Sequence, residues 1–213
     1  MERNSELNTE SDLFGSAEKA PRSLADLNRA IVASEPLMPG AGRPVLGEGA
    51  EGSPIAFVGE QPGDQEDIQG RPFVGPAGQL LDRALEEAGI DRKEVYITNA
   101  MKNFKYQMRG KRRIHQKPTS GEVKRYRWWL DKELDLVGPR IVVALGSTAA
   151  LALAGRSLAI GRNRGEIRLG ERRGYITVHP SYLLRIPEEA AKQEAYGDFV
   201  ADLRKIRQIA VRT

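Results

Sequence analysis

The sequence predicts one α/β domain with a central, mainly parallel four-stranded sheet that is flanked by helices on both faces. Three observations support this prediction. Short apolar runs alternate with amphipathic segments, glycine and proline residues separate the two kinds of segment, and 213 residues with 40% hydrophobic content can form one core. Such alternation is typical of strands joined by crossover helices, which cover a parallel sheet on both sides.

The N-terminal part differs in composition from the rest of the chain. Residues 1–22 are polar and acidic with almost no apolar periodicity, so we expect a disordered tail there and the folded domain over residues 23–213. Ser23 can cap a helix over residues 23–34, and the Pro/Gly-rich stretch 36–52 is expected to be a loop.

Four strands and four further helices follow. The runs IAFVG, VYITNA, RIVVALG and YITVHPS predict strands at residues 55–59, 95–100, 140–146 and 175–181. Amphipathic segments predict helices at residues 76–90, 120–138, 147–155 and 187–210. Pro76 suits a first helical turn, Ser147 suits a helix cap, and Gly138 followed by a proline suits a helix end. Residues 103–119 are expected to form a basic loop.

Polar residues follow each predicted strand at the point where it ends. The loops in question are residues 59–67, 99–104, 146–149 and 179–185. Because the carboxyl ends of parallel strands meet at one edge of a sheet, these acids, amides and a histidine are expected to converge there. Ligands of open α/β sheets bind at that edge, so the sequence predicts an active site on it.

The positive charge of the chain is concentrated in one segment. Residues 102–127 contain ten basic residues and one acidic residue, Glu122, whereas residues 1–101 contain nine basic and eighteen acidic residues. A local basic segment of this kind indicates a polyanionic partner such as a nucleic acid.

Several function classes are excluded or disfavoured by absent residues. The chain has no cysteine, which excludes disulfides, thiolate-bound metal and thiol catalysis, and its two histidines are too few to suggest a metal site. No P-loop or GxGxxG motif supports a general nucleotide-binding domain. No membrane-length apolar run or secretory signal is visible, so we expect a cytoplasmic, nucleoid-associated monomer.

Three motifs together resemble the uracil-DNA glycosylase superfamily. They are GEQPGDQEDIQGRPFVGPAGQLLD at residues 59–82, Asn99 at a strand end, and VHPSYLLR at residues 178–185. The sequence KRRIH at residues 111–115 resembles the UdgX-type branch, whose members are relatives of the iron–sulfur family 4 enzymes. The resemblance covers residues 24–208 and implies the uracil-DNA glycosylase fold and a role in DNA repair.

The resemblance implies five residues that bind the base. Once the uracil has left the stack, Phe73 would stack on it and the side-chain amide of Asn99 would read its edge. His179 would donate a hydrogen bond to O2 of the departing uracil anion. Gln61 would offer its backbone or side chain to the base, and Gly63 would let the backbone approach closely.

The resemblance also implies the residues that act at C1′ of the sugar. In the UdgX-type branch the histidine that ends KRRIH attacks C1′, so His115 is expected to form a covalent bond to the abasic site. Glu60 would orient this nucleophile, and Asp64 would assist as a carboxylate near the sugar. Alternatively, KRRIH could be a basic surface loop whose histidine has no catalytic role. Likewise, Glu66 and Asp67 could belong to a solvated acidic turn.

Phosphate contacts are expected from the basic segment and from the residues after the HPS motif. Arg185 and the leucines before it are assigned to a wedge that enters the groove. The residues expected to bind DNA are Lys102, Lys111, Arg112, Arg113 and Arg185, and Lys102 could support its loop instead of a phosphate.

The sequence departs from these relatives in its lack of cysteine. Family 4 and UdgX-type enzymes hold a four-iron–four-sulfur cluster on cysteines, and this chain has Tyr126 where one of them is expected. We therefore expect no cofactor, and we expect packing by Tyr126, Trp128 and Trp129 to replace the cluster.

The sequence thus predicts a uracil-DNA glycosylase that excises uracil from DNA, with single-stranded DNA as the expected partner, and traps its product through His115. Two alternatives stay open. One is a monofunctional glycosylase that uses water activated by Glu60 or Asp64. The other is a non-catalytic sensor that binds uracil in DNA.

Overall fold

The computed structural model describes residues 21–38 and 40–212, so the tail predicted over residues 1–22 lies almost wholly outside the described residues. Its centre is a five-stranded sheet with the strand order β3-β2-β6-β8-β7. The strands are β2 (Ile55–Gly59), β3 (Tyr96–Asn99), β6 (Ile141–Leu145), β7 (Gly165–Leu169) and β8 (Arg172–Thr177).

Four of these strands are parallel and correspond to the four that the sequence predicts. The predicted count of four is wrong because β7 adds an antiparallel edge strand beside β8. The segment GEIRL alternates between half-buried and exposed positions up to its buried last residue, Leu169, so it lacks the continuous apolar run of the inner strands.

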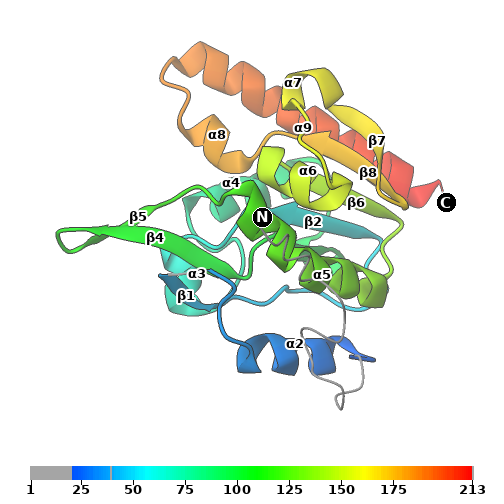
Figure 1. Cartoon of the computed structure of the whole chain (residues 1–213). Helices are drawn as coiled ribbons and strands as arrows, with labels where there is room; N and C mark the ends of the chain where they lie inside the picture. The colour runs from blue at the N-terminus through cyan, green and yellow to red at the C-terminus, as the bar shows by residue number, and fades with distance from the viewer. Residues whose placement is uncertain (1–20, 39, 213) are drawn as a thin grey trace, which may run out of the picture.

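Helices cover both faces of this sheet, as predicted (Figure 1). Alternate strand residues point to opposite faces: Ala56 and Val58 pack in one cluster, and Ile55 and Phe57 pack in the other. The first face is covered by α5 (Ser120–Val137) and α6 (Ser147–Ala154), and α2 (Leu24–Ala33) packs on α5 and extends the same apolar cluster. The second face is covered by α4 (Pro76–Glu87), α8 (Pro180–Leu184) and α9 (Glu189–Val211).

The helix ends follow the signals that the sequence contains. Ser23 caps α2 by accepting a hydrogen bond from the Asp26 amide. Thr119 and Glu122 form a reciprocal capping box at the start of α5, and Gly138, with φ 62°, ends that helix. Because of these capping residues, α2 and α5 begin and end within a few residues of their predicted bounds.

The basic segment predicted as a loop is instead largely a β-hairpin. β4 (Asn103–Arg109) and β5 (Arg112–His115) pair antiparallel, and β1 (Ala41–Pro44) pairs with β4 on its other side. This hairpin projects from the body of the domain (Figure 1). Basic residues at both of its ends obscure the strand pattern, and Gly110, with φ 61°, supplies the tight turn.

The remaining elements are short. They are α3 (Asp64–Gln69), the 3-10 helix η1 (Arg92–Glu94) and α7 (Ile160–Asn163). No helix in the described part of the chain is long and apolar enough to cross a membrane.

Candidate active site

A cavity of about 900 Å³ lies at the carboxyl edge of the sheet, where the sequence predicts a site. The strand register creates it: Gly59 pairs with Asn99 and Leu145 pairs with Thr177, so the neighbouring strands end at the same level. Residues from all four loops and from the hairpin line the cavity. Among them are Glu60, Gln61, Gly63, Phe73, Asn99, Gly146, His115, His179 and Arg185.

Phe73 occupies one wall of the cavity in an unusual backbone conformation. Its φ is 54°, the left-handed region that residues other than glycine rarely adopt, and its side chain is 5% exposed. Its ring centroid lies 5.8 Å from that of His179. A Cβ on Gly59 would lie 2.5 Å from the Phe73 ring, and a Cβ on Gly78 would lie 1.8 Å from the Phe73 carbonyl oxygen, so both glycines are required by this packing.

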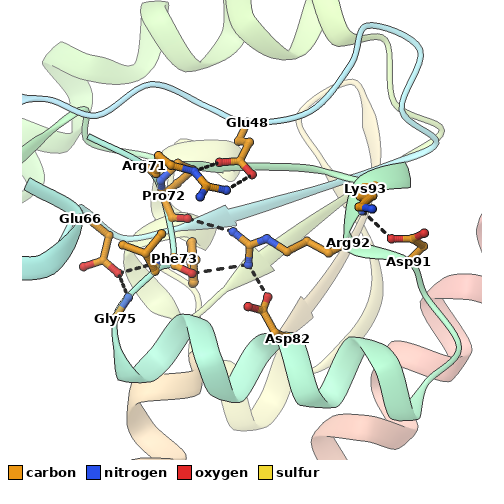
Figure 2. Close-up of polar contacts among 11 residues, drawn as sticks. Glu48, Glu66, Arg71, Pro72, Phe73, Gly75, Asp82, Asp91, Arg92 and Lys93 are labelled. Atoms are coloured by element: carbon orange, nitrogen blue, oxygen red, sulfur yellow. Dashed lines mark hydrogen bonds and ion pairs between the residues drawn. The ribbon is translucent and has the colours of Figure 1, made fainter. Parts of the chain in front are cut away.

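Three ties hold the segment around Phe73 in place (Figure 2). Arg92 donates hydrogen bonds to the carbonyl oxygens of Pro72 (3.0 Å) and Phe73 (3.5 Å). Glu66 accepts hydrogen bonds from the amides of Val74 (3.0 Å) and Gly75 (2.7 Å). The third tie is the ion pair of Arg71 with Glu48 (2.8 Å). The interpretation of Glu66 as part of a solvated turn is therefore wrong, because its buried carboxylate orders this wall.

Asn99 is 3% exposed, and its Oδ1 has no hydrogen-bond partner among the described residues. An amide oxygen buried without a partner is costly, so this atom is suited to accept a hydrogen bond from a ligand. The ammonium group of Lys102 donates a hydrogen bond to the backbone carbonyl oxygen of Asn99 at 3.0 Å and so holds the end of this strand in place.

Lys102 does not have the phosphate-binding position that the sequence suggested. It is 1% exposed, and its ammonium pairs with buried Glu133 (2.5 Å) and donates to Thr98 (2.7 Å). Glu133 also accepts a hydrogen bond from the hydroxyl of Tyr96 (2.9 Å), and burial raises the pKa of that tyrosine. Lys102 thus anchors the end of β3 to α5, and DNA cannot reach its charge.

Glu60 joins the hairpin to the sheet edge. Its Oε1 lies 3.1 Å from Nε2 of His115, and its Oε2 accepts a hydrogen bond from the hydroxyl of Thr148 on α6. Burial raises the pKa of Glu60, but the hydrogen bonds from His115 and Thr148 outweigh it and leave the pKa below its ordinary value. The carboxylate is therefore ionised at neutral pH, and the His115 side chain beside it is 50% exposed toward the cavity mouth.

His179 is neutral at physiological pH. Burial lowers its pKa to about 4. Its Nδ1 accepts a hydrogen bond from the Ser181 amide (3.1 Å), which leaves the proton on Nε2 as a donor. Arg185 donates to the Ser181 hydroxyl (3.1 Å), which in turn lies 2.9 Å from Nδ1, so the predicted DNA-binding arginine also supports this histidine.

The polar residues of the GEQPGD loop fasten the hairpin. The side-chain oxygen of Gln61 accepts a hydrogen bond from the Lys105 amide (3.2 Å), and its NH2 group donates one to the carbonyl oxygen of Gln116 (3.1 Å). These two partners lie on the two sides of the hairpin base. Its side chain is thus engaged by the hairpin, which leaves its backbone for the predicted contact with the base.

Arg113 of the hairpin and Asp64 of α3 form an ion pair with each other. Arg113 pairs with Asp64 (2.6 Å) and with Asp67, and its guanidinium lies 5.1 Å from the ring centroid of Tyr106. The phosphate contact of Arg113 and the sugar contact of Asp64 stay predictions, and in each of them the group would act with its charge already paired inside the protein. Asp67 is likewise a buried hairpin contact and not a solvated turn residue. Lys111 and Arg112 are exposed on the hairpin, as a phosphate contact requires.

The segment after the HPS motif differs from the predicted wedge. Leu183 is part of the core, so it cannot enter a groove, whereas Leu184 is exposed. Tyr182 lines the cavity and is 50% exposed, and the sequence analysis did not single it out. Thr148 was not predicted either, although it lies in the loop at residues 146–149, after the third predicted strand. The strand-end rule identified the loop but not which of its hydroxyls points inward.

The residues of this chain do not fit an iron–sulfur cluster. No thiolate is available, and Tyr126 is buried where the resemblance expects a cluster cysteine. Its hydroxyl accepts a hydrogen bond from the Leu37 amide (3.1 Å) and donates one to Asn103 (2.6 Å). Asn103 in turn bonds the carbonyl oxygen of Gly42 (2.8 Å). Hydrogen bonds therefore join the N-terminal segment to α5 and β4 at this point.

Comparison with known proteins gives consistent matches over most of the domain. The family model described as Uracil DNA glycosylase superfamily matches residues 46–204. A type-4 uracil-DNA glycosylase of Thermotoga maritima is 40% identical over 144 residues, which are 66% of this chain and 71% of the relative. One of Archaeoglobus fulgidus is 35% identical over 164 residues, 73% of this chain and 78% of the relative. One of Sulfurisphaera tokodaii is 32% identical over 180 residues, 78% and 74% respectively.

Proposed function

We propose that this chain, which belongs to the uracil-DNA glycosylase superfamily, excises uracil from single-stranded DNA and becomes covalently linked to C1′ of the abasic site through His115. The excision part is supported by the type-4 uracil-DNA glycosylases among its relatives. The covalent part, and with it membership of the UdgX-type branch, is supported by one observation above all. His115 lies at the cavity with a ring nitrogen 3.1 Å from an ionised carboxylate.

The cavity is suited to uracil and not to cytosine. Uracil presents an N3–H donor beside the O4 acceptor, and the unpartnered Oδ1 of Asn99 together with its Nδ2 group offers the complementary acceptor and donor. Cytosine has an unprotonated N3 and an amino group at these positions, so it would leave both Asn99 groups mismatched as long as the amide keeps the orientation it has in the structure. Phe73 supplies the stacking surface, and its fixed conformation means that little entropy is lost on binding.

Bond cleavage sends an electron pair from the C1′–N1 bond to the base, and negative charge appears on O2 of the uracil. The Nε2–H of His179 can donate a hydrogen bond to this oxygen. Because the pKa of His179 is about 4, the ring stays neutral at pH 7 and stabilises the uracil anion without protonating it.

The sugar cation that remains at C1′ is then captured. The unprotonated nitrogen of His115 donates its lone pair and forms the bond to C1′, which leaves the ring as an imidazolium. The proton on its other nitrogen is held by the Glu60 carboxylate, which also compensates the new positive charge. If water reached C1′ first, the same carboxylate could accept its proton, and the enzyme would release an abasic site.

Positively charged side chains around the cavity mouth support DNA binding at this site. Arg185 and Lys117 line the cavity, and Lys111 and Arg112 are exposed on the adjacent hairpin. Tyr182 presents a half-exposed ring to the strand and is suited to stack on a neighbouring base. A single strand can place its bases against this surface without unpairing.

The test is incubation with a uracil-containing single-stranded oligonucleotide, followed by a denaturing gel and chromatographic measurement of free uracil. We expect a protein–DNA band that survives denaturation. One free uracil should be released for each covalent adduct formed. His115→Ala should abolish the band while uracil release continues through water. Release without a band in the wild type would support the monofunctional glycosylase, and binding without release would support the sensor.

A further inference from the structure

The carboxylate of Glu60 has two oxygens, and each has its own partner. Oε1 faces Nε2 of His115, and Oε2 accepts the hydrogen bond from the Thr148 hydroxyl. Thr148 is buried, and it is the second residue of α6. Nothing in the proposed reaction brings Thr148 into contact with the DNA.

The fold brings Thr148 to this position through strand pairing. β6 lies beside β2, with Val58 opposite Ala144, so the loop after β6 begins next to the loop that carries Glu60. Gly146, with φ 88°, turns the chain from β6 into α6 and directs the first turn of that helix at the cavity. The amino end of a helix favours a negative charge beside it.

We propose that Thr148 is a positioning residue that holds the Glu60 carboxylate toward His115 and thereby determines what share of the abasic sites left by uracil excision is captured as covalent adduct. The inference rests on the proposed function, since it concerns the capture step of that reaction. A glutamate side chain has three rotatable bonds, and the bond to Thr148 fixes one oxygen so that the other stays aimed at the imidazole.

Loss of the hydroxyl would act on Glu60 in two ways. The Oε2 atom would remain partly buried without a donor, which raises the pKa of the carboxylate toward and above its ordinary value. The side chain would also be free to rotate away from His115. The titratable groups that face Glu60 among the described residues are His115 from β5 and His179 from the turn before α8, and both favour the ionised carboxylate.

The experiment compares the full-length wild type with Thr148→Val and Thr148→Ser. Valine has the shape of threonine without the hydroxyl, and serine keeps the hydroxyl, so the pair separates hydrogen bonding from packing. With protein in excess over a uracil-containing single-stranded oligonucleotide, adduct and free uracil are measured from about pH 5 to about pH 9.

For Thr148→Val we expect adduct formation to slow about tenfold at neutral pH, while uracil release slows less, so that a larger share of the abasic product is free. The acid limb of its adduct–pH profile should move about one unit to higher pH, because a carboxylate without its donor protonates more readily. Thr148→Ser should keep the wild-type profile and stay within about threefold of the wild-type rate. Melting curves of each variant report any effect of the substitution on folding.

A Thr148→Val variant with wild-type partition and pH profile would overturn the inference. So would a Thr148→Ser variant that loses as much adduct as Thr148→Val, since packing would then be the cause. If Thr148→Val does not fold, the profile of Thr148→Ser against that of Thr148→Ala decides the same question. Failure of the proposed function appears separately, as a wild-type protein that releases uracil and forms no adduct.

Discussion

Substitution of Lys102 by methionine tests whether this residue serves the core or the DNA. In the structure its ammonium lies inside the domain with Glu133, and both side chains are buried. Removing one partner of a buried ion pair costs about 3–5 kcal/mol, because the remaining charge is left uncompensated. Tyr96 and Thr98 still donate to Glu133, so we expect the lower end, about 3 kcal/mol.

For a domain of this length that loss corresponds to a melting temperature lower by roughly 6–12 °C. The double-mutant cycle with Glu133→Gln sharpens the test. In the wild type, Glu133→Gln removes the partner of Lys102 and should destabilise the protein. In the Lys102→Met background it removes the uncompensated charge while an amide oxygen still accepts from Tyr96, so it should stabilise the protein.

The assay is thermal denaturation of the four proteins, combined with DNA affinity measured at several salt concentrations. If Glu133→Gln destabilised both backgrounds equally, the pair would not be coupled and the reasoning would fail. The salt dependence gives a second criterion. Lys102→Met should leave the log–log slope of affinity against salt unchanged, whereas loss of a phosphate contact to a single strand would reduce it by about 0.7.

Three further predictions concern the DNA surface and the replaced cluster. Arg112→Ala should reduce the slope of affinity against salt by about 0.7, whereas Arg113→Ala should leave that slope nearly unchanged and lower the yield of adduct, because Arg113 is paired with carboxylates that hold the hairpin. An equal slope change in both variants would contradict this. Tyr182→Ala should weaken binding of single-stranded DNA by about 1–3 kcal/mol in a titration, and Tyr182→Phe should not, since stacking needs the ring alone. Elemental analysis should find no stoichiometric iron, activity should survive chelation, and Tyr126→Phe should destabilise the protein by about 1–3 kcal/mol in denaturant, because Asn103 and the Leu37 amide lose their partner. If Tyr126→Phe unfolds at the wild-type denaturant concentration, packing alone replaces the cluster.

The inner sheet could be predicted because its strands are continuous apolar runs that the helices cover on both sides. Helix ends such as that of α5 could be predicted because Thr119, Glu122 and Gly138 satisfy their backbone locally. The edge strand β7 and the hairpin could not, since most of their residues are half-buried or exposed and so lack a continuous apolar run.

The candidate site divides in the same way. Strand ends predicted which loops meet, and so Glu60, Asn99 and His179 were expected near one another. Sequence spacing says nothing about which charged groups pair across the fold. The resemblance implied a phosphate contact for Arg113 and a loop or phosphate role for Lys102, and it did not show that these residues pair with Asp64 and Glu133.

The two chemical steps proposed for this protein depend on different parts of the fold. In the proposed reaction, base recognition would use Asn99 and His179, which lie at or just after the carboxyl ends of β3 and β8 in the central sheet. Capture uses His115, which the projecting hairpin carries and which the loop after β2 fastens through Glu60 and Gln61. A substitution that loosens the hairpin should therefore reduce adduct formation more than excision. One that disturbs the sheet edge should reduce both, because a nucleophile has nothing to capture until the base has left.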